Sequence, residues 1–316
     1  MQFSVYQESQ IGGRKVNQDR MGYSFTRDAL LLVLADGMGG HLRGEVAASI
    51  FMQAMSNLFQ KNATPYVKKP ERFLEEAFME AHHEIHRYRA ANNLPDTPRT
   101  TAVACLIQHN IATWAHCGDS RLYWLRRGQI LGRTRDHSHI EHLIDKGMAD
   151  PSERSSHPDR NKLYNCIGAS SLPKVDIARP ASLQSGDVLM LCSDGLWSML
   201  SDEDLVHRLS TQTIVRAIPD MIATATAIAG DKGDNATALA IMWQGSPEVE
   251  TAVSSADGMA TVISTMMLPD NLVSTTIQAN TEPENPSEVD AFNDDEIEKA
   301  IAEIRGAIEK SSQIIK

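Results

Sequence analysis

Five aspartates stand at the ends of strand-like segments that lie far apart in the sequence. They are Asp19, Asp36, Asp119, Asp194 and Asp234. Carboxylates at strand ends can converge on one point. Together with a backbone carbonyl they form an oxygen-donor set that suits Mg²⁺ or Mn²⁺ better than Zn²⁺ or copper. A single Asp-Gly pair is often only a turn, but the five aspartates in these contexts predict a divalent metal site.

The glycine-rich stretch ADGMGGHLRGE has a second interpretation, a turn that cradles a nucleotide phosphate. A dinucleotide-binding turn needs the pattern G-x-G-x-x-G. Here Gly37 and Gly39 are followed by Leu42 where the third glycine belongs, and Asp36 in front of them would repel a phosphate. The Lys-Ser/Thr pair of a P-loop does not follow the glycines either. The turn is better explained as a way to present Asp36 and the Gly37 carbonyl to metal ions.

Two histidine-rich segments could also suggest metal sites. In AHHEIH, His82 and His86 have the spacing of an H-E-x-x-H metalloprotease motif, but the glutamate that must follow the first histidine is missing. We expect this segment on the solvated face of a helix. In DHSHIEH, we expect the additional histidines His139 and His142 at the surface rather than in a metal site of their own.

Length and composition are those of a globular protein with a sizeable core. The chain has 316 residues, of which 42% are hydrophobic and 22% charged. Its apolar runs are far shorter than the ~20 residues of a membrane-spanning helix, and its first ten residues lack the basic and apolar regions of a signal peptide. The four cysteines lie in apolar runs without C-x-x-C spacing, which predicts reduced, buried thiols. We therefore expect a cytoplasmic protein that does not bind membranes.

The negative charge is concentrated in the C-terminal part of the chain. The whole chain has 30 basic and 41 acidic residues, and residues 245–316 contain four of the basic and fourteen of the acidic ones. Residues 1–244 therefore carry a net charge of −1, out of −11 for the whole chain. A nucleic-acid-binding face needs clustered Lys and Arg, and this composition indicates none.

The main body, residues 1–244, is predicted to combine short strands with two helical blocks. The strands, rich in β-branched and apolar residues and bounded by turn residues, are expected at 2–8, 21–25, 30–35, 101–107, 111–118, 121–126, 175–178, 187–192 and 237–242. The helices are expected at 44–60 and 71–92, where apolar residues recur at intervals of three and four. Helices clustered between runs of strands indicate α+β layers rather than a regular βαβ alternation. The polar segment 151–165 is expected to be a surface loop.

The tail has a different character. Residues 245–291 are rich in Ser, Thr, Pro, Asn and Glu, which predicts a flexible linker. Residues 292–316 are predicted to form an amphipathic helix with the apolar stripe Ile297, Ile301, Ile304 and Ile308. Such a helix either docks on its own domain or mediates self-association or partner binding.

Seven segments of the main body follow one another in a recognisable order. They are GGRKVNQD, VLADGMGG, TTAV, AHCGDSRLYWLRRGQI, TRDHS, GDVLMLCSDGLW and GDNATALAI. These segments resemble the motifs of the PPM family of metal-dependent protein serine/threonine phosphatases, in particular its bacterial branch. The resemblance covers residues 1–244. It implies an α+β fold, a β-sandwich of two antiparallel sheets flanked by α-helices, and a site for two Mn²⁺ or Mg²⁺ ions.

The resemblance also assigns metal ligands by position. Asp36 matches the carboxylate that bridges two metal ions, and Gly37 matches the residue that contributes its backbone carbonyl. Asp194 and Asp234 match the further ligands of this site. Asp119 of the GDSR segment matches the ligand of a third, weaker metal site in bacterial members.

Two more residues receive roles from the resemblance. Asp19 matches the acid that holds a metal-bound water, and Arg14 matches the arginine that binds the substrate phosphate. The implied reaction is direct attack of a metal-bridging hydroxide on the phosphorus of phosphoserine or phosphothreonine. No cysteine nucleophile is needed, in agreement with the absence of a C-x₅-R motif from the sequence.

One position departs from many eukaryotic relatives, which have a histidine directly after the Asp-Gly pair. This chain has Met38 there, and a thioether cannot donate a proton to the leaving alcohol. A metal-bound water and His41 are both open as alternatives, so the general acid is unassigned.

The leading hypothesis is therefore a Mn²⁺- or Mg²⁺-dependent phosphatase of phosphorylated proteins, opposing a Ser/Thr kinase as bacterial relatives do. A non-catalytic phospho-binding or scaffold protein would be expected to lack some of the metal ligands, and every one is present. A phosphatase of small phosphorylated metabolites is a third hypothesis, which turnover of phosphopeptides and metabolites would distinguish.

Overall fold

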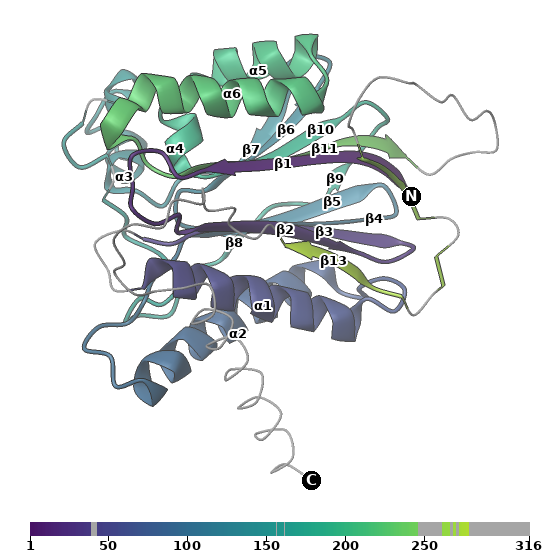
Figure 1. Ribbon diagram of the computed structural model, residues 1–316, viewed down its shortest axis with the longest axis horizontal. Coiled ribbons are helices and arrows are strands. Elements are labelled where there is room, and N and C mark those ends of the chain that lie inside the picture. Colours follow the sequence, from purple (N-terminus) through teal and green to yellow (C-terminus); the bar gives the residue numbers. More distant parts are fainter. Residues whose placement is uncertain are drawn as a thin grey trace, which may run out of the picture.

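Two antiparallel sheets lie face to face, and helices cover both outer faces, in the computed structural model of the chain (Figure 1). The structure describes residues 1–38, 43–155, 157–160, 162–245, 261–265, 268–269 and 272–277. The predicted α+β sandwich is confirmed. Each described strand belongs to one sheet only, so hydrogen bonding within that sheet fixes which strand ends lie next to each other.

The first sheet has six strands, in the order β12-β1-β11-β10-β6-β7. Their bounds are Thr261–Ser264, Gln2–Gln10, Ala236–Gly245, Val188–Cys192, Arg121–Arg126 and Gln129–Arg133. Helices α5 (Asp202–Thr211) and α6 (Ile214–Ala229) cover its outer face (Figure 1).

The second sheet has the order β13-β2-β3-β4-β5-β8, with β9 also paired to β5. The bounds are Ser274–Ile277, Asp19–Phe25, Ala29–Asp36, Ala102–Gln108, Ile111–Cys117, Asp176–Ile177 and, for β9, Ala181–Ser182. Helices α1 (Gly44–Asn62) and α2 (Pro70–Ala91) cover its outer face (Figure 1).

Four short elements complete the fold. They are the helices α3 (His139–Asp145) and α4 (Asp194–Trp197) and the 3₁₀ turns η1 (Pro151–Ser155) and η2 (Gly230–Lys232). The predicted surface loop 151–165 thus begins with a 3₁₀ turn. Helix α4 matters most for the site, because its first residue is one of the five aspartates.

Strand β3 explains why the sheets read as continuous apolar runs. Its even-numbered leucines, such as Leu32, face the core between the sheets, and its odd-numbered residues, such as Val33, face helices α1 and α2. Successive side chains of a strand point to opposite faces. A strand that is covered on both faces is therefore apolar at almost every position. The packed sheets hold the strand ends, which carry the aspartates, in fixed positions.

Helices α5 and α6 were not predicted from the sequence. In α6 the buried residues, from Ile214 through Ile218 and Ile222, do recur at helical spacing. Pro219 within the helix and the abundance of small residues obscured that pattern, since proline is unfavourable in helix interiors. Helix α5 is short and charged, but a capping box of Ser201 and Asp204 fixes its start.

The predicted linker 245–291 contains two strands that we did not expect. Strand β12 pairs with β1, and β13 pairs with β2, each over four residues. An edge strand needs backbone pairing on one side only, so a polar sequence can form it. The flexible-linker prediction is therefore wrong for these eight residues. The predicted helix 292–316 lies outside the described residues.

The cysteine prediction is confirmed, since all four cysteines are buried and free. Among the described residues, no helix is long and apolar enough to cross a membrane.

Thr265, directly after β12, ties the tail to the main body. It is fully buried, and its backbone N–H donates to the Met1 carbonyl at 3.1 Å. Its hydroxyl donates to the Arg27 carbonyl at 2.6 Å and accepts from the Met1 amino group at 3.0 Å. On the other sheet, the hydroxyls of Thr275 and Ser24 lie 2.9 Å apart. The tail thus adds a strand to one edge of each sheet, next to β1 and next to β2.

A chain that ends at residue 245 should be less stable than one that ends at residue 277. It loses both edge strands and the buried hydrogen bonds of Thr265, each worth about 1 kcal/mol. We expect a free energy of unfolding lower by about 2 kcal/mol or more, measured by urea denaturation. Equal midpoints and slopes for the two chains would show that the edge strands add no stability.

Candidate active site

The fold brings the five aspartates together from five places in the chain. Asp36 ends β3, Asp19 begins β2, and the register pairs these two residues. Strand β10 runs antiparallel to β11 with Cys192 opposite Ala238, which places the residues after β10 beside those before β11. Asp194 and Asp234 occupy these two positions, and Asp119 lies in the turn between β5 and β6.

One carboxylate oxygen of Asp19 is buried without a hydrogen-bond partner among the described residues. The side chain is only 3% exposed, and its Oδ2 accepts a hydrogen bond from Ser193 Oγ at 2.7 Å. The other oxygen, Oδ1, is buried and has no hydrogen-bond partner among the described residues. A buried carboxylate oxygen without a partner is costly, and a cation or an ordered water bound there would remove that cost.

The carboxylates raise one another's pKa values. Burial, followed by the charge of Asp19, raises the pKa of Asp36 well above its usual value, and the other three aspartates add to the effect. Burial and the nearby Asp119 raise the pKa of Asp194 in the same way. Burial is also the main cause that raises the pKa of Asp19 to about 6 and that of Asp119 to about 7. Such a cluster favours bound cations at neutral pH.

Two glycines next to the aspartates allow the close backbone approach that this cluster needs. A Cβ on Gly37 would lie 2.4 Å from the Gly44 carbonyl oxygen, so the turn after β3 packs directly on the start of α1. A Cβ on Gly195 would lie 2.1 Å from the Asn235 carbonyl oxygen. Larger residues would push these segments apart. The glycines that follow Asp36 and Asp194 therefore set the spacing of the acids.

Polar residues outside the predicted site hold its backbone in place. Thr100 donates its hydroxyl to the Asp36 carbonyl at 2.8 Å. Asn235 accepts a hydrogen bond from the Gln18 N–H and donates one to the Ile11 carbonyl, both at 2.8 Å, which fixes the loop before β2. Both residues lie in recognisable sequence segments, TTAV and GDNATALAI. The spacing of those segments did not reveal which backbone groups they bind.

Arg14 lies at the rim of the aspartate cluster. Its Nη2 forms an ion pair with Asp234 Oδ2 at 2.6 Å, and its side chain is 50% exposed. A half-exposed guanidinium next to the acids is accessible to a phosphate group that arrives from solvent, and its planar fork suits phosphate oxygens.

Met38 directly follows Gly37, and its backbone N–H donates to the Arg99 carbonyl at 3.0 Å. The other candidate for the proton donor, His41, lies outside the described residues. The general acid therefore stays unassigned.

The structure corrects the prediction for His82. This residue is 3% exposed and packs on the buried face of α2, where its Nδ1 accepts a hydrogen bond from the Gly168 N–H at 3.2 Å. It lies one helical turn after Phe78, so it shares the face of that buried residue. His83, next to it, is exposed as expected, and so is His142, whereas His139 is partly exposed.

His116, His137 and Asp176 lie close enough together to suggest a metal site. However, the side-chain atoms that could bind a metal already form hydrogen bonds within the protein. His137 Nδ1 accepts from the Gly118 N–H at 3.1 Å, and its Nε2 lies 3.1 Å from Asp176 Oδ2. His116 Nε2 lies 2.6 Å from the Arg135 carbonyl oxygen. These contacts describe a structural hydrogen-bond cluster.

The aspartate cluster itself fits divalent metal ions. It offers hard carboxylate oxygens and the Gly37 carbonyl, burial and neighbouring carboxylates raise the pKa values of Asp36 and Asp194, and Asp19 Oδ1 has no hydrogen-bond partner among the described residues. Hard oxygen donors of this kind suit Mg²⁺ and Mn²⁺.

Comparison with known proteins agrees with the sandwich and its acidic centre. The model of the protein phosphatase 2C family matches residues 7–227, and the chain belongs to this family. The serine/threonine phosphatase stp of Listeria innocua is 28% identical over 230 residues, which cover 72% of this chain and 90% of the relative.

Solved structures show the same fold. The crystal structure of the Mycobacterium tuberculosis serine/threonine phosphatase PstP/Ppp is 29% identical, with a TM-score of 0.67 over 77% of this chain and 100% of that one. The catalytic domain of PstP in complex with two manganese ions is 27% identical, with a TM-score of 0.62 over 76% and 98% of the two chains.

The raised pKa of Asp119 predicts a pH-dependent effect of its charge on stability. The fold raises this pKa from the ordinary value of 3.8 to about 7, so the folded state keeps a proton that the unfolded state has lost. Protonated Asp119 therefore adds to the free energy of unfolding. This contribution is complete below pH 3.8 and is lost as the pH rises through 7. Without metal, Asp119→Asn should be more stable than the wild type at pH 8, by about 1 kcal/mol or more, and the gap should shrink at pH 5.

Urea denaturation in EDTA at both pH values measures this difference. Asp119→Asn also removes a charge that raises the pKa values of Asp194 and Asp36, which adds to the gap at pH 8. A gap of equal size at pH 5 and pH 8 would contradict the raised pKa. Added Mn²⁺ should stabilise the wild type more than the variant at pH 8.

Proposed function

We propose that this chain is a Mn²⁺- or Mg²⁺-dependent phosphatase that removes phosphate from phosphoserine and phosphothreonine of proteins. The observation that carries the proposal is the convergence of five mutually repelling aspartates in a member of the protein phosphatase 2C family. Relatives that match most of this chain are serine/threonine phosphatases by name, and one was solved with two manganese ions.

Each acid has a role in this proposal. Asp36, together with the Gly37 carbonyl, would hold both ions, with Asp194 and Asp234 as further ligands. Asp119 would contribute to a third, weaker site. When bound, two such ions lower the pKa of a water to near neutrality and neutralise charge on the phosphate.

The remaining steps fall to residues of the chain. Asp19 would hold and orient a water through its free Oδ1, while its Oδ2 stays fixed by Ser193. Arg14 would leave Asp234 for the phosphate oxygens of the substrate and stabilise the charge that develops on them. The attack needs no covalent intermediate on the protein. Burial raises the pKa of every cysteine thiol, which leaves the thiols protonated and poorly nucleophilic.

Finer points follow from the same proposal. The substrates would be proteins phosphorylated by a Ser/Thr kinase, and the site of action would be the cytoplasm. The C-terminal segment 292–316 would mediate self-association or partner docking through its isoleucine stripe.

Loss of one ligand should abolish turnover. Asp36→Asn and Asp194→Asn should each lower kcat for p-nitrophenyl phosphate by about 100-fold or more, and EDTA should remove the activity of the wild type. Asp220→Asn, which changes a half-exposed aspartate on α6, is the matched control and should keep full activity. Metal-independent turnover at the wild-type rate would refute the proposal.

Substrate class is a separate question with its own expected result. A phosphothreonine peptide should be turned over with a higher kcat/KM than small phosphorylated sugars or nucleotides, since Arg14 offers one contact to phosphate at an exposed rim. The reverse ranking, with Mn²⁺ dependence intact, would indicate a metabolite phosphatase.

A further inference from the structure

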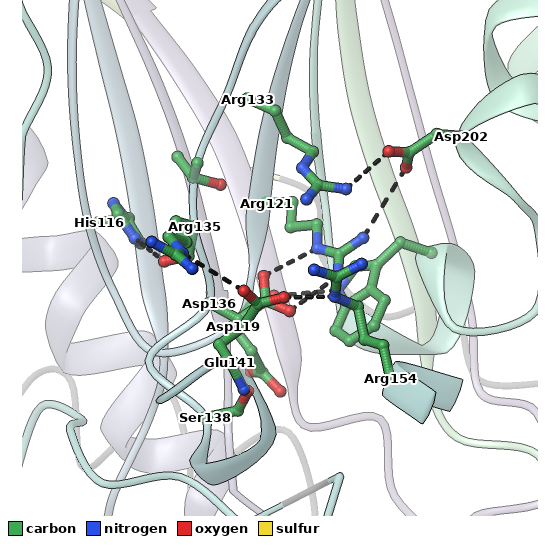
Figure 2. A network of polar contacts seen from close by, with 12 residues as sticks. His116, Asp119, Arg121, Arg133, Arg135, Asp136, Ser138, Glu141, Arg154 and Asp202 are labelled. Atoms are coloured by element: carbon green, nitrogen blue, oxygen red, sulfur yellow. Dashed lines mark hydrogen bonds and ion pairs between the residues drawn. The ribbon is translucent and has the colours of Figure 1, made fainter. Parts of the chain in front are cut away.

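The turn that carries Asp119 is held by residues with no ligand role. Asp119 lies between β5 and β6 and is 5% exposed. Next to it lies a network of charged side chains, in which the buried Arg121 lies between the buried Asp136 and the partly exposed Asp202 (Figure 2). Through Trp197, on which Arg121 packs, this network reaches the main chain of Asp119.

One hydrogen bond joins this turn to the segment that carries Asp194. Trp197 Nε1 donates to the backbone carbonyl of Asp119 at 2.9 Å. Trp197 is the last residue of α4, and Asp194 is the first. Helix α4 is a single turn, so Trp197 lies only three residues after Asp194. Its indole N–H therefore connects the segment of Asp194 to the turn of Asp119.

The indole ring is itself fixed in place. The guanidinium of Arg121 lies over it, 3.5 Å from the ring centroid. Arg121 in turn donates to both oxygens of Asp136, at 2.8 and 2.7 Å, and both side chains of this pair are 4% exposed. A buried bidentate pair restricts the guanidinium, and the guanidinium packed against the ring restricts the indole.

The other side of the turn is also fixed through the main chain. The N–H of Gly118 donates to His137 Nδ1 at 3.1 Å, and His137 is anchored by Asp176 at 3.1 Å. The Gly118 carbonyl, in the peptide group directly before Asp119, accepts from the His137 N–H at 2.9 Å, and the Asp119 carbonyl, in the group directly after it, accepts from Trp197. Both peptide groups next to Asp119 are therefore held by a defined partner.

We propose that Trp197 is a positioning residue that sets the geometry between Asp119 and Asp194 through its indole N–H. The inference rests on the proposed function, because that function supplies the metal ions that Asp119 and Asp194 would hold. Loss of the N–H would leave the Asp119 carbonyl without its donor, and a buried carbonyl without a donor favours rotation of the peptide toward water. The carboxylate on that residue would rotate with it, so metal affinity would fall selectively.

The test removes the N–H and keeps the ring. Trp197→Phe retains an aromatic face for Arg121 but cannot donate to Asp119. Trp124→Phe is the matched control, because Trp124 Nε1 donates a bond of similar length, 3.0 Å, to Asp187, which is not one of the five clustered aspartates. Asp119→Asn defines which equivalent of bound metal depends on Asp119.

Mn²⁺ titration of the metal-free proteins, followed by the electron paramagnetic resonance signal of free Mn²⁺, provides a readout apart from activity. The Mn²⁺ ion whose binding is lost in Asp119→Asn should bind about 10-fold or more weakly to Trp197→Phe, as expected when a residue that orients a metal ligand is lost. The other equivalents should stay within about two-fold. Trp124→Phe should bind as the wild type does.

Four results would overturn the inference. Wild-type binding in Trp197→Phe would show that the N–H does not position Asp119, and equal weakening of all equivalents would show a general structural role. Unchanged binding in Asp119→Asn, with loss in Asp36→Asn, would remove Asp119 from the ligands while the phosphatase function stands. Failure of the wild type to bind Mn²⁺ at all would instead refute the proposed function, and the inference with it.

Discussion

Repulsion among five carboxylates at one point is the constraint on which the rest of the structure depends. Burial, and after it the charge of Asp19, raises the pKa of Asp36 well above its usual value. Two sheets with covered outer faces hold the strand ends that carry these acids in place. A cation bound by these carboxylates would offset the free-energy cost of burying them close together. Metal binding would therefore also stabilise the fold.

The acids meet because antiparallel pairing makes strand ends neighbours. Asp19 and Asp36 are opposed by register, and Asp194 and Asp234 lie just beyond the adjacent ends of β10 and β11. Backbone contact then brings the segments closer than side chains would permit, as Gly195 against Asn235 shows. The site is thus determined by sheet register and two glycines more than by any flexible loop.

Much of this was predictable, because its signals are local. A strand covered on both faces, such as β3, must be apolar throughout, and an acid followed by glycine marks its end. Helix α6 was missed because Pro219 and small residues weakened the periodic signal, and β12 and β13 were missed because edge pairing has almost no sequence signature. The burial of His82 and the partner of Trp197 depend on contacts with residues that are distant in sequence, which no spacing rule reports.

Several of the supporting hydrogen bonds leave carboxylate oxygens of the acids unused, although both oxygens of Asp234 have partners, Arg14 and the Asn235 N–H. Thr100 and Trp197 bond to the main-chain carbonyls of Asp36 and Asp119, and Ser193 occupies just one oxygen of Asp19. Bonds to main-chain atoms orient an acid without using its carboxylate oxygens, which are the atoms that a metal ion requires. A site made for cations needs rigid acids whose oxygens are otherwise unpaired, and that combination is costly wherever metal is absent. The orphan Oδ1 of Asp19 is the clearest sign that the polar network was built around a ligand that the chain does not itself provide.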